Sequence, residues 1–214
     1  AERDRRVAEA LAADREHAIR AVLVSHVDTA SSALSDIAAI RAAMDAAGHP
    51  ALLAVDAIAS LACDELRMDA WGVDVLVGAS QKGLMLPPGL AFVWFSDKAR
   101  EACRGADLRT PYWDWEPRAF ASEYYQYFGG TAPTAHLFGL RESLTMLLEE
   151  EGLEQAWRRH EALAGAVWAA FDTWGAGTST IALNIADPRH RGRSVTAARI
   201  GNGGAGALRA WLEA

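Results

Sequence analysis

Four short apolar runs mark the first half of the chain and predict buried β-strands, because each is bounded by Gly, Pro or Asp. They cover residues 21–26, 51–56, 73–80 and 90–96. Residues 35–48 repeat apolar positions at helical spacing, with Ser35 or Asp36 able to cap the start and Gly48 the end. A strand–helix–strand unit of this kind predicts parallel strands. The fourth run follows the third too closely for a helical crossover, so we expect it to be antiparallel.

The second half predicts two helices and a small pair of strands. Pro133 suits the first turn of a helix over about 133–150, and a second helix is expected to run from Gly152 to about Trp174. Two strand-like runs, 180–187 and 194–201, then flank a polar turn, and a new helix begins near Gly206. The fold class is therefore α/β: a mostly parallel sheet with one antiparallel strand over residues 1–155, followed by part of a smaller α+β domain over residues 156–214.

Both ends of the chain suggest an interior piece of a longer polypeptide. Residues 1–21 open inside a helical pattern, and residues 206–214 close in one without a cap. We expect the N-terminal part of the first domain to be absent and the second domain to be truncated.

Composition excludes several classes of protein. A net charge of −7 and a pI near 5.4 argue against nucleic-acid binding, which needs a clustered basic face. No apolar run approaches the roughly 20 residues of a membrane span. Cys63 and Cys103 form no paired motif, so we expect a reducing compartment, the cytoplasm. The histidines show no spacing typical of metal ligands, and we predict no metal.

Three polar residues follow or end successive predicted strands: Thr29, Asp56 and Lys82. Ligands of open α/β sheets bind beyond the carboxyl ends of parallel strands. A lone lysine is most often a solvated loop charge, and a buried aspartate facing a lysine can be an ordinary ion pair. A lysine beside a carboxylate also suits pyridoxal 5′-phosphate (PLP), since the amine can bind the aldehyde and the carboxylate can keep the pyridine nitrogen protonated.

Residues 49–90, HPALLAVDAIASLACDELRMDAWGVDVLVGASQKGLMLPPGL, resemble the core of the class V, fold type I PLP-dependent aminotransferases. The resemblance is nearest to the serine–glyoxylate and alanine–glyoxylate group. The segments SHVDTASSA (25–33), YWDW (112–115) and FGGTAPTAHLFGLRESL (128–144) match in place, so the similarity extends along essentially the whole chain.

The resemblance implies roles for six residues. Lys82 corresponds to the lysine that forms the Schiff base and later carries the proton, and it is the expected catalytic residue. Asp56 corresponds to the partner of the pyridine nitrogen, and Thr29 to the hydroxyl near the phenolic oxygen of PLP.

The other three carried-over residues also concern the cofactor. Ile58 resembles the apolar residue on one ring face, and Gln81 the phosphate-contacting residue beside the lysine. Thr131 resembles the threonine that reaches the phosphate of the neighbouring subunit's PLP, which implies a homodimer with shared active sites. The family's phosphate-binding helix and its substrate-carboxylate arginine would lie before residue 1 and after residue 214. Arg199-Ile200-Gly201 has the sequence of the arginine motif. We do not assign it that role, because the segment resembles an earlier strand–turn–helix of the family, which precedes the true motif.

The implied reaction moves an amino group from a small amino acid to a 2-oxo acid such as glyoxylate or pyruvate. Serine is the first choice of donor, with alanine or aspartate next. Gly129 and Gly130 replace the aromatic, histidine or tyrosine residues of many relatives and leave the substrate open. A pyridoxamine–pyruvate type of enzyme and a scaffold without activity are alternatives. A cysteine desulfurase would need a reactive cysteine in a later part of the chain.

GNGGAG (201–206) satisfies the dinucleotide-binding fingerprint and would indicate an oxidoreductase. The match is weak, because the preceding strand is half polar and the chain ends before the acidic residue that should bind the ribose.

Overall fold

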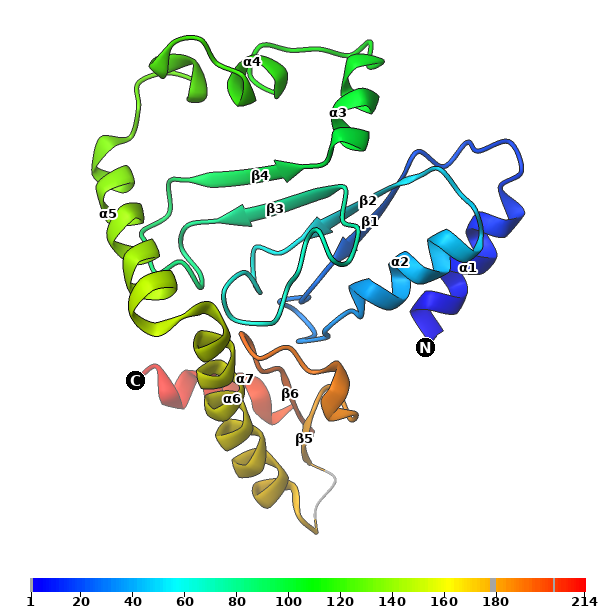
Figure 1. The fold of residues 1–214 in the computed structure, drawn as a ribbon. Coiled ribbons are helices and arrows are strands. Elements are labelled where there is room, and N and C mark those ends of the chain that lie inside the picture. Colours follow the sequence, from blue (N-terminus) through cyan, green and yellow to red (C-terminus); the bar gives the residue numbers. More distant parts are fainter. Residues whose placement is uncertain (1, 178–179, 202) are drawn as a thin grey trace.

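The computed structural model describes residues 2–177, 180–201 and 203–214. Its centre is a four-stranded sheet in the order β1-β2-β3-β4 (Figure 1). The first three strands are parallel and β4 is antiparallel to β3, which confirms the predicted topology. The strands are β1 (Ala21–Ser25), β2 (Leu52–Asp56), β3 (Val75–Ala79) and β4 (Ala91–Phe95).

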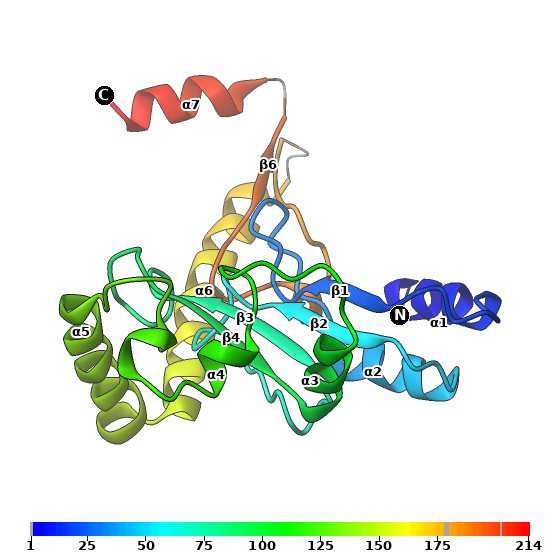
Figure 2. The same cartoon turned by 90° about the horizontal axis from the view of Figure 1, so that it is seen from above.

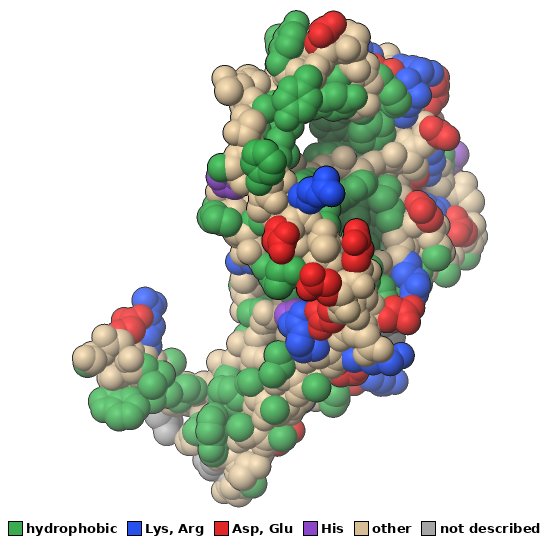
Figure 3. Space-filling view, turned by 60° about the vertical axis from the view of Figure 1, so that its left-hand side comes forward, with side chains coloured by type: hydrophobic (Ala, Val, Ile, Leu, Met, Phe, Trp, Pro, Cys, Tyr) green, Lys and Arg blue, Asp and Glu red, His purple; other side chains and the backbone are tan. Residues whose placement is uncertain are grey.

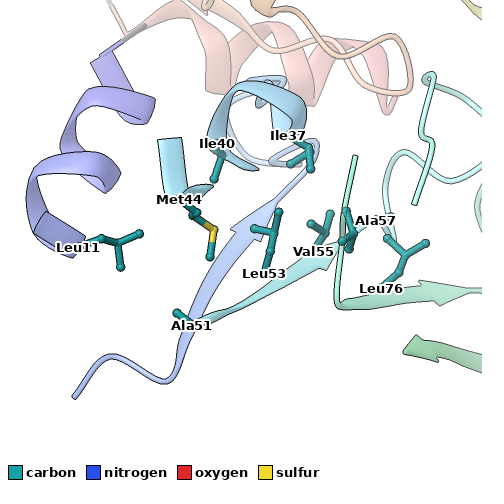
Figure 4. Packing of buried hydrophobic residues seen from close by; sticks show 10 residues of the cluster. Leu11, Ile37, Ile40, Met44, Ala51, Leu53, Val55, Ala57 and Leu76 are labelled. Atoms are coloured by element: carbon teal, nitrogen blue, oxygen red, sulfur yellow. The ribbon is translucent and has the colours of Figure 1, made fainter. Parts of the chain in front are cut away.

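One face of the sheet is covered by α1 (Glu2–Ala13) and α2 (Ile37–Ala46), as Figure 4 shows. The side chain of Asp36 caps α2 by accepting a hydrogen bond from the Ala39 N–H at 2.9 Å. Helical spacing places the three buried side chains of α2 on one face, against the strands. Each buried side chain of this size stabilises the fold by about 1.5–3 kcal/mol. The main members of this core are Leu11, Ile37, Ile40, Met44, Leu53, Val55 and Leu76.

The opposite face of the sheet is uncovered over β1 and β4. Leu23 on β1 is 81% exposed, and Val93 on β4 is 39% exposed. Leu23 is in register with Ala54, so the strand alternation puts Asp56 on this same open face. Asp56 is therefore exposed although it belongs to β2, because this face of the sheet is uncovered among the described residues.

Two long helical segments follow one another: the first lies beside the ends of β3 and β4, and the second continues past the sheet (Figure 1). The predicted helix over 133–150 is found, but it changes character: α5 ends at Leu144 and a π-helical stretch continues to Glu151. Gly152, with φ of +85°, separates this stretch from α6. The elements of this half are α3 (Asp97–Arg104), α4 (Glu116–Ala119), η1 (Tyr124–Tyr127), α5 (Thr134–Leu144), η2 (Thr145–Glu151) and α6 (Leu153–Gly175).

The last part of the chain forms a small antiparallel pair, β5 (Ile181–Leu183) and β6 (Ala198–Ile200), with η3 (Pro188–His190) between them. α7 (Gly204–Leu212) projects away from the rest of the chain (Figure 2). In the GNGGAG run, Asn202 lies outside the described residues. Among the described helices, none is both long enough and apolar enough to cross a bilayer.

Candidate active site

The ends of β1, β2 and β3 meet at one edge of the sheet. Ser25 is in register with Asp56, and Asp56 with Val77. Thr29 follows β1, Asp56 ends β2, and Lys82 comes three residues after the last residue of β3. All three residues are exposed, and each stands at or after the carboxyl end of one of three neighbouring strands, so a hydroxyl, a carboxylate and an amine lie at the same end of the sheet.

Asp56 is exposed, which differs from the buried aspartate considered from the sequence. Its Oδ1 accepts a hydrogen bond from the N–H of Ile58 at 2.9 Å, which fixes the rotation of the carboxylate. Within the described part of the chain, no ion pair joins Asp56 to Lys82. The interpretation of these two residues as a simple buried salt bridge is therefore wrong.

His26 supports the backbone at Asp56 from the neighbouring strand. The backbone N–H of His26 donates to the carbonyl of Asp56 at 2.9 Å. Its ring nitrogen Nδ1 shares a 2.9 Å hydrogen bond with Oγ of Ser60. His26 and Ser60 are both buried. Burial lowers the pKa of His26 below its usual value, which favours the neutral ring. These contacts tie the turn that carries Ile58 to the end of β1.

Ser80 closes the base of the loop that carries Lys82. Its Oγ donates to the carbonyl of Pro87 at 2.8 Å and accepts from the N–H of Leu90 at 3.2 Å. Its N–H also donates to the carbonyl of Leu90, at 3.1 Å. Ser80 is completely buried, whereas Gln81 and Lys82 are exposed at the surface. The loop is consequently braced at its base by a buried serine, whereas the lysine that it carries is exposed.

Gly83, next to Lys82, packs against the turn that follows β2. A Cβ placed on Gly83 would lie 2.2 Å from the carbonyl oxygen of Leu61 and 2.8 Å from Sγ of Cys63. Only glycine allows this approach, which brings the Lys82 loop against the turn that starts at Asp56. Burial raises the pKa of the Cys63 thiol to about 11, so this sulfur is a packing group and not a nucleophile.

Thr29, Ile58 and Thr131 differ in their local surroundings. Thr29 sits at the tip of a turn in which Asp28 accepts hydrogen bonds from the N–H groups of Ala30 and Ser31. Ile58 is half-buried, and its position is set by Asp56. Thr131 is exposed and precedes α5; no interaction in the described residues joins it to Asp56 or Lys82.

The group of side chains at this edge fits PLP. A lysine amine can bind the aldehyde, a carboxylate suits a protonated ring nitrogen, and hydroxyl and amide groups suit the phenolic and phosphate oxygens. The described residues place no acid in an ion pair with Lys82, so its amine remains available to an aldehyde. The tight approach at Gly83 provides the rigid support that a covalently held cofactor requires.

Sequence reasoning missed the residues that support this edge. The side chain of Ser80 bonds the backbone groups of Pro87 and Leu90, and the side chains of His26 and Ser60 bond each other. Burial of a serine next to an exposed lysine has no local signature, although the glycine and proline content of the loop does indicate a shaped turn.

Comparison with known proteins agrees with the geometry. The family model described as Aminotransferase class-V matches residues 2–202, so the chain belongs to the class V aminotransferases. The chain is 45% identical over 200 residues to the L-aspartate–glyoxylate aminotransferase of Paracoccus denitrificans, which covers 92% of this chain and 48% of the relative. It is 44% identical over 175 residues to the serine–glyoxylate aminotransferase of Methylorubrum extorquens, covering 79% and 43%. The chain spans about half the length of these relatives.

The same fold is found in solved structures. An alanine–glyoxylate aminotransferase from Nostoc sp. superposes with a TM-score of 0.80 at 26% identity, covering 95% of this chain and 53% of that one. The pyridoxamine-pyruvate aminotransferase from Mesorhizobium loti gives a TM-score of 0.77 at 29% identity, covering 94% and 49%. The expected fold type I architecture is thereby confirmed.

Proposed function

We propose that the protein containing this chain is a PLP-dependent aminotransferase that moves an amino group from a small amino acid to glyoxylate. The observation that carries the proposal is the meeting of Thr29, Asp56 and Lys82 at one edge of the open sheet face. Three parallel strands supply these groups independently, and the site chemistry of PLP needs all three. Membership of the class V family supports the same reaction.

Each residue has a defined task. Lys82 would hold the cofactor through its Nζ, and its freed amine would take the proton from the α-carbon of the substrate and deliver it to C4′ of the cofactor. Asp56 would keep the ring nitrogen protonated, and Thr29 would donate to the phenolic oxygen. Bound PLP supplies the electron sink that makes the α-carbon proton acidic. Ile58 would pack on the ring, and Gln81 would contact the phosphate.

The relatives support glyoxylate as the acceptor, since the L-aspartate–glyoxylate and the serine–glyoxylate aminotransferases both carry glyoxylate in their names. The donor is a small amino acid, with serine first and aspartate or alanine next. The two glycines before Thr131 leave more room at the loop than a pair of aromatic or imidazole residues would, which is compatible with any of these donors.

Two subunits share each site in this proposal. Thr131 belongs to a segment rich in exposed aromatic residues, of which Trp113 is 72% exposed and Tyr125 is 64% exposed. In Figure 3, hydrophobic side chains gather around a hollow at the upper end of the molecule. Exposed apolar surface of this extent is typical of an interface. We assign it to a homodimer in which Thr131 reaches the phosphate of the partner's PLP.

The organisation of the chain completes the proposal. Residues 1–155 form part of the PLP-binding domain, and residues 156–214 begin the C-terminal domain. The protein acts in the cytoplasm, in keeping with two unpaired cysteines.

The test is a half-reaction screen on the full-length protein loaded with PLP. Serine, aspartate, alanine and pyridoxamine are added one at a time without an acceptor, and the visible absorbance of the bound cofactor is followed. Serine or aspartate should bleach this absorbance, and addition of glyoxylate should restore it and release glycine. A response to pyridoxamine with pyruvate alone would favour the alternative type of enzyme. No response to any donor would show that the assignment is wrong.

A further inference from the structure

The loop that carries Lys82 is held from outside by one face of α5. Ser143, which is buried, donates its hydroxyl hydrogen to the carbonyl of Leu84. His136 donates from Nε2 to the carbonyl of Pro88 at 3.1 Å. These two side chains are seven residues apart, which is two helical turns, so they lie on the same face of the helix.

Between these two contacts the helix comes close to the loop. A Cβ on Gly139 would lie 3.3 Å from Cδ2 of Leu86, so little space separates the helix backbone from that side chain. Gly89 also packs under the ring of His136, because a Cβ there would lie 2.5 Å from Nε2. The α5 face therefore follows the loop from Leu84 to Gly89.

The loop needs such support because its backbone conformation is unusual. Met85 has φ of +59°, in the left-handed region of backbone conformation that residues other than glycine rarely adopt. Its N–H donates to the carbonyl of Lys82 at 2.9 Å, which closes a tight turn directly after the lysine. A conformation of this kind persists when the surrounding contacts fix it. Ser143 donates to the carbonyl of Leu84, which lies within this turn between Lys82 and Met85.

We propose that Ser143 and His136 are positioning residues for Lys82: they hold the carbonyls of Leu84 and Pro88 and so fix the direction of the lysine amine. The inference rests on the proposed function. It also gives α5 a second task, because the helix starts three residues after Thr131. One rigid element thus connects the Lys82 loop of a subunit to the segment assigned to its partner's cofactor.

The experiment compares Ser143→Ala and His136→Ala with Glu142→Ala in the full-length protein. Glu142 is an exposed neighbour on α5 and serves as the matched control. Deuterium uptake by peptides spanning residues 82–90 is measured first without PLP. Loss of the hydrogen bond to the carbonyl of buried Leu84 should raise the exchange rate there by roughly tenfold in Ser143→Ala. Pro88, the acceptor of His136, is exposed, so His136→Ala should raise the rate by a smaller factor, and Glu142→Ala should leave it unchanged. Ser143→Thr retains the hydroxyl and should restore protection.

The second measurement is made with PLP bound. Ser143→Ala and His136→Ala should weaken PLP binding about three- to tenfold and shift the pH at which the visible absorbance changes, while Ser143→Thr should restore both. Uptake and titration equal to those of Glu142→Ala would overturn the inference. Because the exchange experiment is performed without cofactor, it separates failure of the inference from failure of the proposed function, which is tested by whether Lys82 takes PLP at all.

Discussion

Asp64 accepts two hydrogen bonds from Arg193, 129 residues further along the chain. Its Oδ1 lies 2.9 Å from the backbone nitrogen and 3.3 Å from Nη1 of Arg193. Asp64 is completely buried, and its carboxylate joins the turn after β2 to the segment between β5 and β6. The pair fixes the small strands against the body that carries the candidate site.

Removing the Asp64 carboxylate should strongly lower the stability of the fold. Asp64→Ala leaves the Arg193 backbone N–H and guanidinium without their buried partner, and we expect a loss of about 3–5 kcal/mol in the free energy of unfolding. Glu161→Ala is the matched control, since Glu161 contacts the same guanidinium at the surface and should cost about 1 kcal/mol or less. Chemical denaturation measures both. Equal losses in the two variants would show that Asp64 contributes no more than a surface partner.

Gly83→Ala should distort the loop that carries Lys82. The added Cβ would lie 2.2 Å from the Leu61 carbonyl, so either the loop or the turn after β2 must move. We expect a loss of about 1–3 kcal/mol in stability, together with weaker PLP binding. Gly165→Ala tests the glycine effect alone, because nothing lies within 4 Å of its Cβ position in α6. That variant should gain about 0.5–1 kcal/mol. Thermal unfolding that ranks the two variants in the opposite order would contradict the packing at Gly83.

Local patterns accounted for the strands, for α2 and for the parallel and antiparallel pairing, because apolar periodicity and loop length determine these features. They also placed Asp56 and Lys82 at neighbouring strand ends. They did not predict the change from α5 to a π-helical stretch at Thr145, since a leucine repeat continues through it. The exposure of Asp56 was missed because an alternating strand does not reveal which of its faces is covered.

Support from distant residues was invisible in the sequence for a different reason. The hydroxyl of Ser143 bonds a carbonyl 59 residues earlier, and Asp64 bonds a backbone N–H 129 residues later. A serine in a helix and an aspartate in a turn are both ordinary at the local level. Only the packing of α5 and of the segment before β6 on the sheet body gives them their partners.

The two cysteines should differ sharply in reactivity. Burial raises the pKa of Cys63 to about 11, and the nearby carboxylate of Asp64 acts in the same direction, so the thiol stays protonated far above neutral pH. At pH 8, iodoacetamide should alkylate the half-buried Cys103 and spare Cys63, as peptide mapping would show. Raising the pH to 9 should increase the slow rate at Cys63 about tenfold, because the thiolate fraction rises tenfold per pH unit below the pKa. In denaturant both should react, and equal rates in the native protein at pH 8 would contradict the burial of Cys63.

Asp56→Ala should retain PLP poorly and lose activity by on the order of 100-fold, the scale of removing one electrostatic group from an active site. The neutral pyridine ring that results is a weak electron sink. Asp69→Ala removes an exposed carboxylate from the segment between β2 and β3 and should leave turnover unchanged. Near-normal turnover by Asp56→Ala would mean that this aspartate serves only to shape the turn at Ile58.

Reduction of the PLP-loaded, full-length protein with borohydride tests the central claim most directly, because it makes the bond between cofactor and lysine permanent. Digestion and peptide mapping should then find the pyridoxyl mass on Lys82. Lys82→Ala should carry no label, and Lys98→Ala should be labelled as the unaltered protein is, since Lys98 is engaged with Asp74 and the carbonyl of Ala51. Label on another lysine, or none on Lys82 under saturating PLP, would contradict the assignment of this edge of the sheet as the active site.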